Sequence, residues 1–380
     1  MSQPIVSETA SPDSMEVEEI LPFERKPLTA ADIILAKELL FDKYTLKDEY
    51  PYKDTVRSFK WDAIRKCLAF IENLQYDANR WAIFQNYKNV NREAPLVRKY
   101  TQNVYRRIAD TLGVERYQSV PLYLPSDTLV PERYGRDGAL VSFLGETGSF
   151  YRVSPVSIEG EWWVPRRYVK LLSDSTQFNH VVVVDRGDQN IATLERLEEG
   201  TWAIRSMNPA TTGMHRPPYA QETPLGMFVV QQKKSRMVFL KDGSAATGGY
   251  APYASRFTNG AYIHGVPVNV PRTAMIEYSW SLGTTPRSHM CVRNATSHAK
   301  FVYDWAPTER SLVIRVISIK LTLFTEEEGQ KIRNFAAEYF SGRKKSCKII
   351  SSNFFFLPCS CLSPVRISRR KESLFLLNPL

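Results

Sequence analysis

The chain has 380 residues, which is enough for two or three domains with cores of their own. Hydrophobic residues make up 43% of it and charged residues 24%, ordinary globular values that exclude a wholly disordered or collagen-like chain. The net charge is +10, and no run of about 18 apolar residues is present, so we expect no transmembrane segment.

The excess positive charge is concentrated in the last part of the chain. Residues 317–380 hold eleven basic and five acidic side chains, which is +6 of the +10. A basic segment suits an anionic partner, but the sequence has no RNA-binding or zinc-finger signature. We therefore predict a basic, poorly ordered tail at 317–380 and expect no nucleic-acid partner.

The beginning of the chain predicts a disordered lead and then helices. Residues 1–24 are rich in Ser, Glu and Pro, which is typical of disorder. Residues 25–115 are predicted to form an α-helical module of three or four helices. Thr29 and Asp32 resemble a capping box at its start.

Three segments carry the prediction of that helical module. Apolar residues follow helical spacing in 33–41, 61–74 and 97–112, the last ended by Gly113. Cys67 lies on the apolar stripe of the second segment, so we expect a small core residue there.

The pattern changes to short strands over residues 116–172. Segments of β-branched and aromatic residues alternate with glycines, which predicts a small antiparallel barrel. Its closing stretch, Trp162–Val169, resembles the end of a bacterial SH3-like domain: a strand, a turn that begins at Pro, and a Tyr-Val strand. This resemblance implies an accessory role toward cell-wall polymers or a neighbouring catalytic domain.

Residues 178–316 are predicted to form a mainly β catalytic domain. Val181–Asp185 reads as its first strand, and further β-rich segments continue to residue 316 without a long helix. The stretch Gly243–Gly249 lacks the Gly-Lys-Ser/Thr ending of a phosphate-binding loop, so we interpret it as a hairpin turn or a flap.

Cys291 stands among residues that can activate a thiol. His289 precedes it by two positions, Arg293 follows it by two, and His264 lies upstream. Thiolate is the reactive form; an imidazole can take the thiol proton, and a guanidinium favours the anion. In an extended segment the side chains at 289, 291 and 293 point to one face, while those between them pack behind. The pattern indicates a cysteine nucleophile.

A structural cysteine and a zinc site are the two alternatives to a nucleophile. Against a structural cysteine, three of the five histidines lie within 35 residues of one another and bracket Cys291. A zinc site would need further ligands at a spacing such as C-x-x-C, and the sequence has none here. We therefore expect no metal and no cofactor.

The same residues resemble the catalytic domain of the L,D-transpeptidase (YkuD) family. Its signature is a His-Gly or His-Ser pair, then Ser/Thr-His-Gly-Cys followed by a hydrophobic residue and Arg or Asn. His264–Gly265 and Ser288–Arg293 match it, and Thr223–Phe228 resembles the family's Thr-Pro-x-Gly-x-Phe/Tyr strand entry. The resemblance covers about residues 178–316 and implies an L,D-transpeptidase-like β-sandwich.

The resemblance implies a peptidoglycan L,D-transpeptidase. Cys291 would attack the carbonyl between the third and fourth residues of a stem tetrapeptide, form an acyl-enzyme and pass the acyl group to an amine acceptor. His264 would be the base, with its ring oriented by the carbonyl of Gly265. His289 would be a second imidazole near the thiol.

Three more residues receive roles from the resemblance. The backbone N–H groups of Met290 and Cys291 would stabilise the oxyanion. Arg293 would hold a substrate carboxylate, which suits a bidentate guanidinium. Ser288 would orient the loop rather than react.

Two departures from the signature leave alternatives open. Met290 replaces Gly before the nucleophile, and the interval from His264 to Cys291 is 27 residues, longer than is common. An L,D-carboxypeptidase or endopeptidase on the same scaffold is one alternative. A catalytically decayed wall-binding protein is another.

The expected partners are peptidoglycan stem peptides and, through the basic tail, anionic wall polymers. This chemistry implies the cell envelope or periplasm, although Met1–Glu19 shows no signal peptide.

Overall fold

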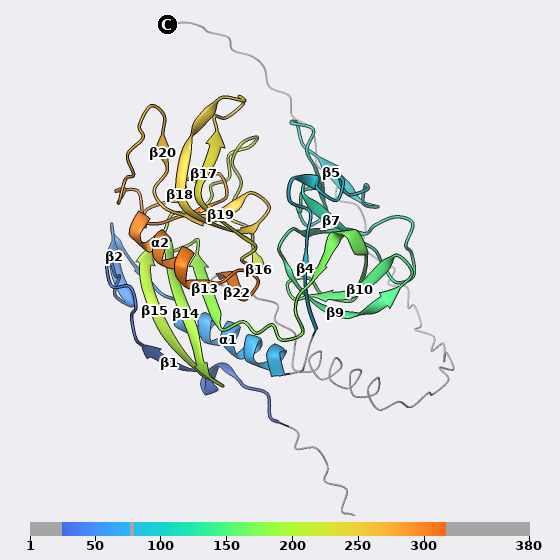
Figure 1. Ribbon diagram of the computed structural model, residues 1–380, viewed down its shortest axis with the longest axis horizontal. Coiled ribbons are helices and arrows are strands. Elements are labelled where there is room, and N and C mark those ends of the chain that lie inside the picture. The colour runs from blue at the N-terminus through green and yellow to red at the C-terminus, as the bar shows by residue number, and fades with distance from the viewer. Residues whose placement is uncertain (1–24, 77–79, 317–380) are drawn as a thin grey trace, which may run out of the picture. The chain divides into compact units, whose positions relative to one another are not determined.

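The computed structural model describes residues 25–76 and 80–316 (Figure 1). Within these ranges strands predominate, and the α-helices are two: α1 (Trp61–Tyr76) and α2 (Thr296–Trp305). The prediction of a mainly β fold is confirmed. No helix in these ranges is long and apolar enough to cross a membrane. The lead predicted at 1–24 and the tail predicted at 317–380 lie outside the described residues.

A six-stranded sheet forms the centre of residues 178–316, which were predicted to be catalytic and are called the catalytic region below, in the order β1-β15-β14-β13-β22-β16. Its strands are β1 (Ile34–Lys37), β13 (His180–Asp185), β14 (Asn190–Glu198), β15 (Thr201–Pro209), β16 (Gly226–Val229) and β22 (Ser311–Val316). β13 pairs with β14 antiparallel and with β22 parallel, so that Val182 lies opposite Val313. Residues 181–184 are at most 3% exposed, because β13 has a strand on each edge and a core on each face.

The alternation of side chains along β13 separates two hydrophobic cores. Val181 and Val183 pack in one core with Ile64 and Leu68 of α1. Val182 and Val184 belong to the other core, which also contains the apolar residues beside the candidate nucleophile. The sheet is therefore packed on both faces, and α1 lies across one of them (Figure 1).

The helix predicted over 61–74 is confirmed as α1. Its buried stripe contains Ile64, Leu68 and Ile71 at helical spacing. Cys67 is 1% exposed, and burial raises the pKa of its thiol to about 11. The prediction of a core cysteine is confirmed.

The rest of the helical module predicted over 25–115 is wrong. The segment 33–41 contains strand β1, which pairs parallel to β15 with Ile34 opposite Thr201. Ile34 is 62% exposed, since β1 is an edge strand. Thr29 and Asp32 do form the capping-box hydrogen bonds, but they begin only a 3₁₀ turn, Ala30–Asp32.

The segment 97–112 is likewise not a helix. It forms the hairpin β5 (Tyr100–Gln102) and β6 (Ile108–Asp110), and Val104 between them is 90% exposed. The apolar spacing of this segment therefore has no common buried face. Two other small hairpins are β2 (Glu49–Tyr52) with β3 (Thr55–Ser58), and β7 (Ser119–Leu122) with β8 (Arg133–Arg136).

A second sheet of the catalytic region has the order β17-β18-β19-β21, with β20 paired to β18. Its strands are β17 (Gln232–Leu240), β18 (Thr247–Thr258), β19 (Ala261–His264), β20 (Val268–Asn269) and β21 (Val292–Arg293). The turn predicted in the glycine-rich stretch is confirmed, because residues 241–246 connect β17 and β18 as a hairpin. Helix α2 was not predicted: its N-cap, Ala295, makes no side-chain capping bond and gives no start signal.

A third, antiparallel sheet has the order β11-β10-β9-β4-β12 (Figure 1). Its strands are β4 (Arg80–Phe84), β9 (Leu140–Thr147), β10 (Phe150–Pro155), β11 (Trp162–Pro165) and β12 (Val169–Leu171). The strands, and the turn after Pro165, were predicted, but β4 comes from the region expected to be helical. The SH3-like assignment and the domain boundaries remain predictions.

A buried ion pair joins this third sheet to the catalytic region. Asp137, in the β8–β9 turn, lies 2.5 Å from Arg256 of β18, with side chains 0% and 8% exposed. The Thr258 hydroxyl donates to the Asp137 carbonyl oxygen, and the Val229 N–H donates to the Gly138 carbonyl at 2.9 Å. The two parts thus share a hydrogen-bonded, desolvated contact.

Candidate functional site

The parallel pairing of β19 with β21 brings the candidate catalytic residues together. Ile263 lies opposite Val292, and His264 lies opposite Arg293. Because side chains alternate along a strand, His264 and Arg293 point to one face together with Cys291. Ile263 and Val292 are 0% exposed on the opposite face, in the core. The strand register therefore puts residues 264, 291 and 293 on one face, and their catalytic roles stay a prediction.

The Cys291 thiol is half-buried and donates weakly to the Gly260 carbonyl oxygen, 3.6 Å from Sγ. Burial raises the pKa of Cys291, while the backbone N–H of Tyr262 and the charge of Arg293 oppose that rise without reversing it. The resting thiol is therefore protonated at neutral pH and needs a base before it can attack.

His264 is a buried, neutral imidazole on the same face of the sheet. His264 is 3% exposed, and burial lowers the pKa of its imidazole to about 4. Nδ1 lies 2.6 Å from the Gly265 carbonyl oxygen; since a carbonyl only accepts, Nδ1 carries the proton and Nε2 is the free base. The contact expected between His264 and the Gly265 carbonyl is present.

Gly265 is required by close packing. A Cβ at this position would lie 2.7 Å from Thr296 Oγ1 and 2.9 Å from Pro252 Cγ. The Gly265 N–H donates to the Pro252 carbonyl at 2.9 Å. The backbone that orients His264 is thereby fixed against two neighbouring elements.

Ser288 holds the loop that precedes the nucleophile. It is 1% exposed, and its hydroxyl donates to the Cys291 carbonyl oxygen. Its N–H donates to the Thr212 carbonyl at 3.0 Å. These contacts fit an orienting role.

The structure places His289 differently from the prediction. Residues 289–290 form a bend, and the strand begins only at Val292, so the expected alternation does not reach His289. Its side chain is 48% exposed, and Nε2 lies 2.7 Å from Asp242 Oδ1 in the β17–β18 turn. Asp242 was not predicted, because only the folded hairpin brings it to residue 289.

Met290 is accommodated without backbone strain. Among the described residues with positive φ, Met290 does not occur, so the position does not require glycine. Its carbonyl accepts from the Thr223 hydroxyl at 2.8 Å. The N–H groups of Met290 and Cys291 donate to no atom in the described ranges, and both remain available to a substrate oxygen.

Arg293 presents unused donors to the site. Its backbone pairs with Thr211 through two hydrogen bonds of 2.9 Å. Its Nε is buried and has no partner among the described residues. Burial lowers the pKa of Arg293, and the charge of Arg287 adds to this effect. A bound anion would offset both the burial of this charge and its repulsion by Arg287.

His298 does not belong to the site. It lies in α2 at 0% exposure, with Nε2 2.9 Å from the Ser206 hydroxyl and its ring against Phe41. Burial lowers its pKa to about 3. Within the described ranges, no group of three or more His, Cys, Asp or Glu side chains is placed to hold a metal ion.

The comparisons with known proteins concern the catalytic region. The sequence model described as the L,D-transpeptidase catalytic domain (YkuD) matches residues 179–316. No curated protein matches.

Several solved structures are similar at low identity. An L,D-transpeptidase from Mycobacterium smegmatis is 16% identical, with 47% of this chain and 92% of that chain covered and a TM-score of 0.30. One from Mycobacterium tuberculosis H37Rv is 20% identical over 48% of this chain and 92% of that chain, with a TM-score of 0.30.

A third structure is larger: a fused Zn-dependent amidase/peptidase/peptidoglycan-binding domain-containing protein from Clostridium acetobutylicum ATCC 824. It is 18% identical over 36% of this chain, with a TM-score of 0.26. This chain covers 52% of that protein, about half its length. On the family match, the chain carries an L,D-transpeptidase catalytic domain at residues 179–316.

Proposed function

We propose that this domain is a peptidoglycan L,D-transpeptidase with Cys291 as its nucleophile. The observation that carries the proposal is the β19–β21 pairing, which puts His264 and Arg293 on the face of the Cys291 thiol. A neutral imidazole with a free Nε2, a thiol and an unpaired guanidinium are the groups that acyl transfer from a carboxylate-bearing peptide requires. Because peptidoglycan lies outside the cytoplasmic membrane, we also propose that the protein acts in the cell envelope.

The acylation step forms a carbon–sulfur bond and breaks a peptide bond. His264 Nε2 takes the thiol proton as Sγ attacks the carbonyl after the third residue of a stem tetrapeptide. The N–H groups of Met290 and Cys291 stabilise the oxyanion. The resulting imidazolium then gives its proton to the leaving amine of the fourth residue, which leaves a thioester on Cys291.

The second step regenerates the enzyme. The amine of another stem peptide attacks the thioester and gives a proton to His264, and the thiol recovers it as the carbon–sulfur bond breaks. Arg293 holds a peptide carboxylate through both steps. Ser288 keeps the Cys291 carbonyl in place, which fixes the direction of the neighbouring N–H groups.

Two contacts give His289 a different role from that of a second imidazole at the thiol. Its bond to Asp242 attaches the β17–β18 turn to the nucleophile loop. Asp242 also lies 3.5 Å from Arg216. We assign to the His289–Asp242 pair the role of positioning the β17–β18 turn beside the nucleophile loop.

The experiment is intact-mass spectrometry after incubation with a disaccharide-tetrapeptide. The wild-type protein should gain the mass of the acyl group, and Cys291→Ala should not. Release of a cross-linked dimer identifies a transferase, whereas release of a tripeptide alone identifies the hydrolase alternative. Absence of both adduct and product from a folded wild-type protein would contradict the proposal and favour the decayed wall-binding protein.

A further inference from the structure

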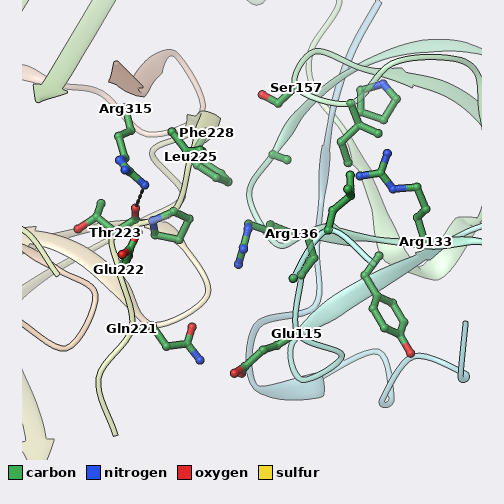
Figure 2. Close-up of a pocket in the computed structure, with 18 of the residues that line it drawn as sticks. Glu115, Arg133, Arg136, Ser157, Gln221, Glu222, Thr223, Leu225, Phe228 and Arg315 are labelled. Carbon is green, nitrogen blue, oxygen red and sulfur yellow. Dashed lines mark hydrogen bonds between the residues drawn. The ribbon is translucent and has the colours of Figure 1, made fainter. Parts of the chain in front are cut away.

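A cavity of about 460 Å³ lies between two parts of the chain (Figure 2). One part is formed by residues 112–158, and the other belongs to the catalytic region. The size of the cavity falls in the range of small-ligand pockets, about 300–1,000 Å³. One wall includes Arg133 and Arg136 of β8, and the other includes Leu225, Phe228 and Arg315. Cys291, His264 and Arg293 do not line it. The cavity is therefore distinct from the site of the proposed reaction.

Two arginines of this lining, Arg136 and Arg315, form no ion pair with a described residue. The carboxylates that share the lining have other partners: Glu115 pairs with Arg107 and Glu222 with Arg186. Figure 2 shows the Arg136 guanidinium pointing into the gap between the walls. No ion pair or hydrogen bond joins that guanidinium to any described residue. Burial lowers the pKa of Arg136, and the charges of Asp110 and Glu115 oppose this shift without reversing it. Arg133, in contrast, has Asp110 at 4.0 Å.

Arg315 stands on the opposite wall (Figure 2). One of its terminal nitrogens donates to the Thr223 carbonyl at 2.6 Å, while Nε is buried and has no partner in the described part of the chain. Burial and the charge of Arg186, with a smaller effect of Arg136, lower the pKa of Arg315 to about 10, and the carboxylates of Glu222 and Asp185 oppose this shift. Burial is the main penalty on both guanidinium groups, and their mutual repulsion adds a smaller one. An anion held between them would offset both.

The rest of the lining selects among anions. Apolar groups, including Leu225, Phe228 and Ile158, contribute much of the wall, and Leu225 is 46% exposed. A phosphate ion would gain nothing from these side chains. A carboxylate attached to a small apolar group would use both the guanidinium pair and the apolar wall.

The cavity wall also touches the nucleophile loop from behind. The Gln221 N–H donates to the His289 carbonyl at 2.8 Å, and the Thr223 hydroxyl donates to the Met290 carbonyl at 2.8 Å. Both Gln221 and Thr223 line the cavity, and Arg315 binds the Thr223 carbonyl. An anion bound by Arg315 would therefore change the hydrogen bond between Arg315 and Thr223, and Thr223 in turn holds the backbone of Met290.

We propose that this cavity is a second ligand site that takes the C-terminal carboxylate of a short peptide with small apolar side chains, held between Arg136 and Arg315. The site binds its ligand without a covalent step, so the proposal does not depend on transpeptidation by Cys291. Because Gln221 and Thr223 both line the cavity and bind the backbone of residues 289–290, a bound peptide would change the position of the nucleophile loop.

The test is calorimetric titration of N-acetyl-D-alanyl-D-alanine into the full chain carrying Cys291→Ala and Arg293→Gln, which remove the thiol and the guanidinium of the reaction site. The C-terminal amide of the same peptide, which keeps the apolar groups and lacks the charge, should bind at least about tenfold more weakly. Arg136→Gln and Arg315→Lys should each weaken binding of the acid by about tenfold. The matched control is Arg106→Gln, an exposed arginine in the β5–β6 turn, which should change the Kd less than about twofold.

Melting temperatures separate ligand binding from a structural role. Because Arg136 is a buried charge without an ion pair, Arg136→Gln should leave the melting temperature unchanged or raise it. Equal binding of acid and amide, equal binding of inorganic phosphate and peptide, or an Arg136→Gln protein that binds like the Arg106→Gln control would each overturn the proposal. No binding of the acid to the Cys291→Ala, Arg293→Gln protein would overturn the proposal as well, and binding to the Cys291→Ala protein alone would then assign the peptide to the reaction site.

Discussion

Cys291 and His264 have pKa values that oppose an ion pair in the resting protein. Burial raises the pKa of the thiol and lowers that of the imidazole to about 4, so the proton stays on sulfur at neutral pH. In cysteine enzymes with a preformed thiolate–imidazolium pair the shifts run in the opposite direction. Proton transfer in this site must therefore accompany attack on the substrate carbonyl rather than precede it.

The first prediction concerns alkylation of the thiol in the absence of substrate. The rate of Cys291 modification by iodoacetamide should keep rising with pH beyond about pH 9, because only the rare thiolate reacts. The measurement is mass spectrometry of the peptide that contains residue 291. Cys67, which is 1% exposed, is the internal control and should stay unmodified in the folded protein. A rate that levels off between pH 6 and 8 would show that a thiolate is preformed.

Gly265 gives a second prediction at this scale. In Gly265→Ala the new Cβ would lie 2.7 Å from Thr296 Oγ1 and 2.9 Å from Pro252 Cγ, so the strand must shift. We expect the free energy of unfolding to fall by about 1–3 kcal/mol, measured by urea denaturation. Gly260→Ala is the matched control, since nothing lies within 4 Å of its Cβ position. Equal stability of the two variants would refute the close packing at residue 265.

The elements differ in how far the sequence predicts them. The apolar run 181–184 was predicted because a short continuous apolar run is typical of a strand buried on both faces. The stripe of α1 was predicted because its apolar residues recur at helical spacing. The segment 33–41 has enough apolar residues for a helix, yet it forms an edge strand because β15, far along the chain, offers a pairing partner. Tertiary pairing of this kind overrides local spacing and leaves no local signal.

The same distinction applies to the site. His264, Gly265, Ser288, Cys291 and Arg293 were predicted because they stand in short motifs. Thr223 lies within a motif that was noticed, but its hydroxyl contact to Met290 was not foreseen. Asp242 and Tyr262 have no motif, and they reach the site only through the β17–β18 turn and the register of β19.

The Asp137–Arg256 pair supplies the prediction at the scale of elements. Asp137→Ala leaves a buried guanidinium without its carboxylate between the β8–β9 turn and β18. We expect the free energy of unfolding to fall by about 3–5 kcal/mol, measured by urea denaturation. The double variant Asp137→Ala, Arg256→Met removes the uncompensated charge and should recover part of that loss. A double variant no more stable than Asp137→Ala would contradict this account.

Over the whole molecule, buried neutral histidines make stability depend on pH. His264 and His298 have pKa values of about 4 and about 3, against about 6.5 in an unfolded chain. Between these pKa values the unfolded chain binds more protons than the folded protein. The contribution of these histidines to the free energy of unfolding is therefore fully present above pH 6.5 and falls as the pH drops. Each histidine contributes at most about 1.4 kcal/mol per pH unit.

The fourth prediction follows from this linkage. The melting temperature should be constant above about pH 6.5 and should fall steadily from there to pH 5, above the range where ordinary carboxylates titrate. His298→Gln should reduce the slope without abolishing it, because His264 stays buried and burial also lowers the pKa of His180. A melting temperature that does not change between pH 6.5 and 5 would rule out the linkage.

The strand order of the central sheet has a consequence for how the protein is made. β13 ends at Asp185, but its parallel neighbour β22 begins only at Ser311. During synthesis one edge of β13 therefore stays open until the last strand of the domain has left the ribosome, and β16 waits for the same partner. Open strand edges attract other chains. A chain that stops before residue 311 leaves both β13 and β16 without this partner, so the domain's vulnerable period is set by the translation speed over residues 186–310.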